Sequence, residues 1–132
     1  RLVSRRTISV PMIGVVTCGQ PILAIENIEA SYSLPSELFG GTDLFMLVAK
    51  GHSMVGAGIK DGDILVVKKQ PFASPEDIII ALIDEEATVK RYRPTPTHII
   101  LHPENPSFSD ILVKECQIIG KVVSYIHRFA MT

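Results

Sequence analysis

Short apolar runs separated by turn-forming residues are the main pattern along this chain. The runs at 45–48 and 64–67 bracket a loop rich in small residues, and they predict two buried strands on either side of Ser53. No long stretch repeats its apolar positions at the spacing of an amphipathic helix. The pattern therefore predicts a compact, mainly β domain of many short strands with little helix.

The same pattern predicts further strands along the second half of the chain. Segments 78–83 and 87–93 are expected to pair as a hairpin around an acidic turn. On the second arm, the alternation of side chains places Lys90 on the same face as Thr88. Three more strands are expected beyond the hairpin, at 98–101, 111–113 and 118–126.

The amino-terminal part divides into a tail and the beginning of the domain. Residues 1–9 are basic and polar, and we expect a solvated linker tail there, with a single domain over 10–132. Within 10–24, two β-prone runs are interrupted by a loop at Cys18-Gly19. Residues 34–38 are expected to form one helical turn.

Composition excludes several classes of function. The 46% hydrophobic content predicts a folded core, and the 13 basic against 14 acidic residues leave no basic field to hold nucleic acid. The two cysteines, Cys18 and Cys116, lie in no metal-ligand spacing, so we expect free thiols, no metal and no cofactor. No apolar run is long enough for a membrane span and no signal peptide is evident, so we expect a soluble, cytoplasmic protein. Because the chain begins at Arg1, we expect a fragment of a longer protein.

Ser53 is the candidate nucleophile, because its turn is held by two rigid strands and is flanked by glycines that allow tight bends. Glycine and serine are also ordinary turn residues, so a purely structural loop remains the alternative. The four histidines do not favour a Ser-His-Asp triad. His52 is adjacent to Ser53, where neighbouring side chains diverge, and His98, His102 and His127 belong to no motif.

A lysine activates a serine only when it is neutral, which requires removal from water. Lys90 is the candidate base, since the inward face of its predicted strand would bury it, whereas Lys68 and Lys69 lie at a strand end. A lysine on a hairpin arm more often faces solvent, so burial is the feature that decides this hypothesis.

Three ordered segments together resemble the self-cleaving family that holds LexA-type repressors, phage repressors and UmuD-type mutagenesis proteins. They are the cleavage segment 10–21, the Gly51-His52-Ser53-Met54 loop with Asp61-Gly62-Asp63 after it, and Thr88-Val89-Lys90-Arg91. Ser53 follows Cys18 by 35 positions and precedes Lys90 by 37, as the family's arrangement of scissile bond, nucleophile and base requires. The resemblance covers about 10–129 and extends to the His102–Pro106 stretch and the terminal strand.

The resemblance implies a specific reaction on the protein's own loop. Ser53 would attack the carbonyl of Cys18 and release Gly19, with Lys90 as the base. It also implies a fold like that of the signal peptidases and a supporting role for Met54 in the motif. Thr88 would orient Lys90. Two apolar side chains would anchor the cleavage loop, with core packing as the alternative, namely Ile13 and Val16.

The resemblance also implies partners. They are a RecA filament on single-stranded DNA that stimulates cleavage, a second copy of the chain paired through the strand 118–126, and operator DNA bound only by an N-terminal domain outside this chain. The Cys18-Gly19 bond is similar to that of UmuD-type proteins, whereas 20–31 and 103–106 are similar to LexA-type repressors. A dimerisation module with an inert Ser53 is the alternative from a different class.

Overall fold

A single sheet of nine strands makes up most of the computed structural model, which describes residues 6–14 and 22–129. The strands are β1 Thr7–Ile13, β2 Ile28–Pro35, β3 Leu44–Val48, β4 Ile64–Lys69, β5 Ile78–Ile83, β6 Glu86–Pro94, β7 Ile99–His102, β8 Ile111–Val113 and β9 Gln117–Ile126. Helical structure in these residues is one short helix and two 3-10 turns, α1 Ser36–Phe39, Ile25–Asn27 and Val55–Ala57. The prediction of a mainly β fold with little helix is confirmed.

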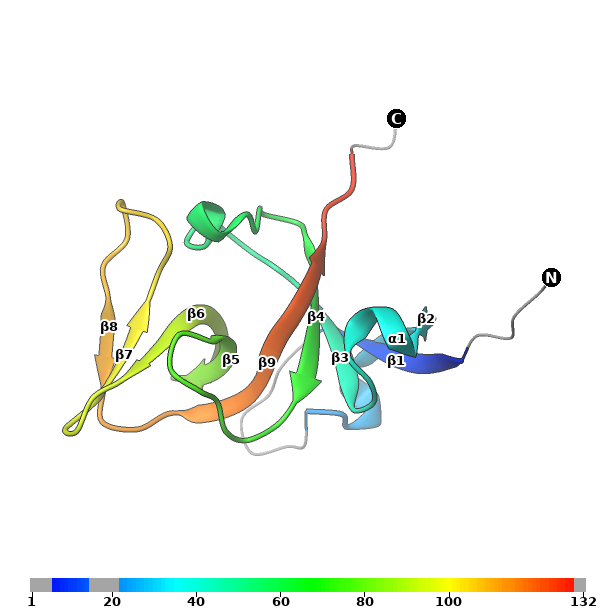
Figure 1. Ribbon diagram of the computed structural model, residues 1–132, viewed down its shortest axis with the longest axis horizontal. Helices are drawn as coiled ribbons and strands as arrows, with labels where there is room; N and C mark the ends of the chain where they lie inside the picture. The colour runs from blue at the N-terminus through cyan, green and yellow to red at the C-terminus, as the bar shows by residue number, and fades with distance from the viewer. Residues whose placement is uncertain (1–5, 15–21, 130–132) are drawn as a thin grey trace.

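The strand order is β2-β1-β3-β4-β9-β5-β6-β7-β8, so β9 lies in the middle of the sheet. Figure 1 shows β9 crossing the centre of the molecule, with β1 to β4 on one side and β5 to β8 on the other. Neighbouring strands are antiparallel except for β1 and β3, which meet in parallel. The last strand therefore joins the half of the sheet that precedes it to the hairpin half.

The local patterns predicted most strands to within one or two residues. Strands β3 and β4 flank the Ser53 loop, and β5 and β6 form the expected hairpin. The helical turn expected at 34–38 begins later, because β2 continues to Pro35 and α1 follows it. Strand β2 was not predicted, since it is an edge strand whose mixed, largely exposed residues give no clear alternation.

The largest core cluster lies beneath the Ser53 loop. Phe45 and Leu65 come from β3 and β4, while Met54 and Ile59 come from the loop itself, and all four are buried. Burying apolar side chains of the loop gives it a fixed position on the sheet. A second cluster packs between β1 and β3, and a third supports β5 and β7.

The terminal strand differs from the free edge that pairing with a second copy would need. Within the described residues, Gly120 and Lys121 pair on both sides, with β4 and with β5, whereas Gln117 and Ile118 pair with β5 only and Val122 to Ile126 pairs with β4 only. The stretch from Val122 to Ile126 is the longer part of β9 that leaves one edge open for another strand. Among the described residues, no helix combines the length and hydrophobicity that a membrane crossing requires.

Candidate active site

The Ser53 loop is held by hydrogen bonds at its two ends and within it. Ala49 N–H donates to the carbonyl of Asp63 at 2.8 Å, and Gly62 N–H donates back to the carbonyl of Ala49 at 2.8 Å. Gly51 adopts a left-handed φ of 85°, which a residue with a side chain rarely adopts. Its N–H donates to the carboxylate of Asp61 at 2.7 Å. Ser53 is thus held on a loop whose ends and interior are both fixed.

Lys90 reaches this loop from β6. Its side chain is 8% exposed, and its Nζ lies 3.3 Å from the Oγ of Ser53. The same Nζ donates to the Oγ1 of Thr88 at 2.8 Å, so the alternation that places these two residues on one face also brings their polar atoms together. Two hydroxyl groups therefore surround the amine.

The surroundings of Lys90 favour its neutral form. Burial lowers the pKa of the Lys90 ammonium from its ordinary value of 10.5, because desolvation disfavours the charged form. No carboxylate of the described residues forms an ion pair with Lys90 that would oppose this effect. A neutral amine beside a serine hydroxyl is able to accept its proton.

A cavity of about 710 Å³ opens at Ser53 and Lys90. It has the size of a ligand cleft and is large enough for a short peptide segment. Its walls combine these two residues with Thr88, with the apolar residues Ile13, Leu47 and Met54, and with the acidic residues Glu29, Glu85 and Glu86. The arrangement provides a nucleophile, a base and a partly apolar recess in one place.

The structure brings together the residues of the predicted site that it describes. Ser53, Lys90 and Thr88 are in hydrogen-bond contact, and Met54 is buried beneath the loop. Ile13 ends β1, is 2% exposed and belongs to the core cluster as well as to the cavity wall. The remaining predicted residues lie outside the described residues, namely Val16, Cys18 and Gly19.

Two histidines make close contacts with aspartates, but neither pair includes Ser53. His102 Nδ1 lies 2.6 Å from Asp110, and His127 Nδ1 lies 2.6 Å from Asp63. Burial alone would raise the pKa of Asp63. Hydrogen bonds from Lys60 N–H and His127 outweigh that effect and hold its pKa below the ordinary 3.8. This second pair ties the start of β4 to the chain beyond β9.

The thiol and the possible metal ligands in the described residues do not indicate a second site. Cys116 is a free thiol packed beside the third core cluster, and burial raises its pKa. No group of three or more histidine, cysteine or acidic side chains there is arranged to hold a metal ion.

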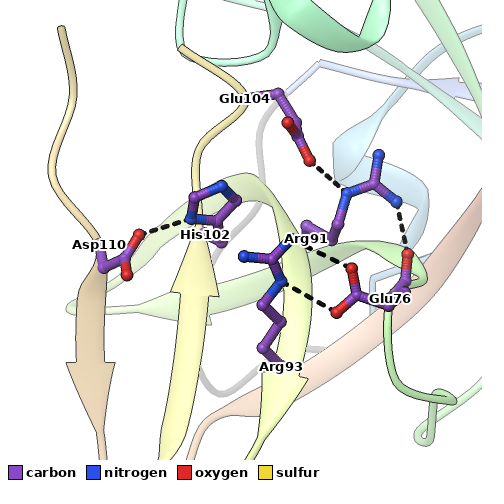
Figure 2. A network of polar contacts seen from close by, with 6 residues as sticks. All are labelled: Glu76, Arg91, Arg93, His102, Glu104 and Asp110. Atoms are coloured by element: carbon purple, nitrogen blue, oxygen red, sulfur yellow. Dashed lines mark hydrogen bonds and ion pairs between the residues drawn. The ribbon is translucent and has the colours of Figure 1, made fainter. Parts of the chain in front are cut away.

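A polar network beside the site was not predicted from the sequence. Figure 2 shows Arg91 between Glu104 and Glu76, where its guanidinium donates to the carboxylate of Glu104 and to the main-chain carbonyl of Glu76. The segment that contains Glu104 also contacts the Ser53 loop, because Asn105 donates to the carbonyl of His52 at 2.8 Å. The Asn-Pro-Ser order was a signal for a turn, but nothing local indicated this distant partner.

Comparisons with known proteins identify the family of the chain. A model of the Peptidase S24-like family matches residues 11–123. The LexA repressor of Caldicellulosiruptor saccharolyticus is 51% identical over 126 residues, covering 96% of this chain and 62% of that protein. The LexA repressor of Desulfitobacterium hafniense is 49% identical over 119 residues, covering 90% and 58% respectively. That of Moorella thermoacetica is 46% identical over 127 residues, covering 96% and 62%. The chain therefore spans about three fifths of the length of these curated relatives.

Proposed function

The chain belongs to the Peptidase S24-like family, and from that membership we propose that it is the self-cleaving serine peptidase region of a LexA-type SOS-response repressor. Ser53 is the nucleophile, Lys90 is the general base, and the bond between Cys18 and Gly19 is the substrate. The observation that carries the proposal is the 3.3 Å distance between Lys90 Nζ and Ser53 Oγ, at a lysine that is 8% exposed.

The chemistry follows from a neutral Lys90. The amine takes the hydroxyl proton as Ser53 Oγ bonds to the carbonyl carbon of Cys18, and the resulting ammonium protonates the departing nitrogen of Gly19. An ester between Ser53 and Cys18 remains. Water then attacks that ester with Lys90 again as the base, which releases the new carboxyl terminus and restores the hydroxyl.

Three other residues support this reaction in the proposal. Thr88 accepts a hydrogen bond from Lys90 Nζ at 2.8 Å and so fixes the direction of the amine. Met54, which is 3% exposed, anchors the nucleophile loop. Ile13 lines the cavity at the end of β1, within the cleavage segment 10–21, and with Val16 it anchors the rest of that segment.

The relatives named as LexA repressors support the role of the whole protein. Cleavage between Cys18 and Gly19 would separate this domain from a DNA-binding domain that precedes it, and the repressor would lose its hold on the operator. A RecA filament on single-stranded DNA would stimulate the reaction by binding the cleavable state more tightly. The chain would act as a homodimer through its terminal strand.

Two other functions are alternatives to a self-cleaving repressor. The Cys18-Gly19 bond favours a UmuD-type mutagenesis protein. The exposed Val123 and Tyr125 on β9 favour a dimerisation module with an inert Ser53, as in a phage-type repressor. The named relatives and the buried Lys90 favour the self-cleaving repressor over both.

Intact mass spectrometry tests the proposal directly. The unsubstituted chain, held for hours at about pH 10, is expected to split into two fragments between Cys18 and Gly19, while Ser53→Ala stays intact. The rate should rise with pH, because the fraction of neutral Lys90 rises. An uncut chain, or a rate that is flat from about pH 6 to about pH 10, would contradict the mechanism.

A further inference from the structure

The segment after β7 contacts the nucleophile loop on both sides of Ser53. Asn105 Nδ2 donates at 2.8 Å to the carbonyl of His52, one residue before the nucleophile, and the same carbonyl also accepts a longer hydrogen bond from Val55 N–H at 3.4 Å. Three residues after the nucleophile, Gly56 N–H donates to the carbonyl of Glu104 at 2.7 Å. The bonds to Asn105 and Glu104 hold the short stretch that carries Ser53 from a segment about fifty residues away in sequence.

The orientation of the Asn105 amide is determined by its neighbours. Its Oδ1 accepts a hydrogen bond from Ser107 N–H at 2.9 Å, so its NH₂ group must face the carbonyl of His52. Rotating the amide by half a turn would bring donor against donor and acceptor against acceptor. Asn105 is therefore a donor toward the nucleophile loop and not an acceptor.

Fixing the His52 carbonyl also fixes the N–H of Ser53. The two groups belong to one planar trans peptide unit, in which C=O and N–H point in opposite directions. Ser53 N–H therefore points away from Asn105, and Ser53 lines the cavity whereas Asn105 does not. No backbone hydrogen bond within the described residues occupies this N–H.

The segment that holds the nucleophile loop, Glu104 and Asn105, is also attached to the strand of Lys90. Arg91, the residue after Lys90 on β6, donates through its guanidinium to the carboxylate of Glu104. Gly56 fits against Glu104 so closely that an added Cβ would lie 2.5 Å from the Glu104 carbonyl oxygen. The position of Asn105 is thus set by the element that carries the proposed base.

From these contacts we infer that Asn105 is a positioning residue, which holds the His52–Ser53 peptide so that Ser53 N–H is directed at the oxyanion formed during attack on the scissile carbonyl. The inference rests on the proposed self-cleavage and adds to it a residue that touches neither the nucleophile's hydroxyl nor the base. A donor fixed before the reaction stabilises the developing negative charge without reorganisation.

The rate of self-cleavage as a function of pH tests this role. Asn105→Ser replaces the amide with a hydroxyl that can still accept from Ser107 N–H, but the serine is too short to reach His52 and introduces no charge. Asn105→Asp keeps the shape and replaces the donor with an acceptor. Gln70→Ser is the matched control, because Gln70 Nε2 donates to the carbonyl of Phe72 at 2.8 Å in a loop without Ser53. All rates are compared at a temperature at which circular dichroism shows each variant to be folded.

We expect Asn105→Ser to lower the plateau rate at high pH about tenfold, and Asn105→Asp to lower it further, up to about a hundredfold. The pH midpoint of Asn105→Ser should be unchanged, because that midpoint reports the neutral fraction of Lys90. The control should cut like the unsubstituted chain.

Three results would overturn the inference. An unchanged plateau in Asn105→Ser would remove the role of the amide while leaving self-cleavage intact. A midpoint displaced toward 10.5 with an unchanged plateau would mean that Asn105 acts through the burial of Lys90. An unsubstituted chain that is never cut would overturn the proposed function, and this inference with it.

Discussion

At the scale of single residues, the site requires a lysine in a position that is unfavourable for stability. Lys90 is 8% exposed, and among the described residues its amine forms hydrogen bonds with the hydroxyl groups of Thr88 and Ser53. Hydroxyls satisfy the hydrogen bonds of the amine but do not balance a positive charge. The property that makes Lys90 a usable base is therefore the same property that makes it costly to bury.

This cost predicts that Lys90→Met stabilises the fold at neutral pH while abolishing self-cleavage. Burial lowers the pKa of Lys90 in the folded state, so the unfolded chain binds more protons between that pKa and 10.5. The free energy of unfolding of the chain with Lys90 therefore rises with pH through this window. We expect Lys90→Met to raise the free energy of unfolding by about 1–3 kcal/mol at about pH 7, with a smaller gain as the pH approaches 10.5.

Urea unfolding at several pH values measures this difference. Both chains should carry Ser53→Ala, so that cleavage does not interfere. Lys69→Met is the control, because Lys69 is exposed at the end of β4 and should show little change. A loss of stability in Lys90→Met at neutral pH would contradict the argument.

At the scale of elements, β9 determines how the two halves of the sheet meet. It pairs with β4 on one side and β5 on the other, and Gly120 lies opposite Lys69 at the end of β4. A Cβ at Gly120 would collide with the carbonyl oxygen of Lys68 and lie 2.6 Å from Val67 Cγ1. The glycine therefore permits a backbone approach that any side chain would prevent.

Gly120→Ala is expected to destabilise the fold by about 1–3 kcal/mol, since the methyl group has no room between β9 and β4. The displacement would also move β5 and β6, and with them Lys90, so self-cleavage should slow more than the loss of folded protein explains. Thermal unfolding and the cleavage rate at one pH measure the two effects. Ser124→Ala on the same strand is the control, and equal behaviour of the two variants would refute the steric argument.

At the scale of the whole molecule, local patterns predicted the elements better than their meeting points. Alternation and turn residues predicted β3, β4 and the β5–β6 hairpin, because those signals are contained within each segment. The contact between Lys90 and Ser53 depends on the order β4-β9-β5-β6, which no local pattern encodes, and only the family resemblance predicted it. The bond from Asn105 to His52 spans 53 residues and had no sequence signal at all.

The sequence likewise predicted the terminal strand but not which part of it is free to contact a second copy of the chain. The terminal strand was expected to pair with a second copy along 118–126, but its middle residues Gly120 and Lys121 are already paired on both sides. The longest stretch of this strand that pairs on one side only is Val122 to Ile126, where Val123 and Tyr125 are 39% and 41% exposed. Exposed apolar side chains beside an unpaired strand edge favour association with an identical edge.

Val123→Lys is therefore expected to weaken dimerisation at least about tenfold, because a charge buried at a strand-to-strand contact has no partner there. Sedimentation velocity across a concentration series measures the dissociation constant. Leu112→Lys introduces the same charge on β8, at a side chain that is 63% exposed, and it should leave the dimer unchanged. Equal weakening by both substitutions would indicate a general charge effect, whereas an unsubstituted chain that remains monomeric at high concentration would exclude the dimer. Loss of the dimer in Val123→Lys alone would place the contact at the second half of β9.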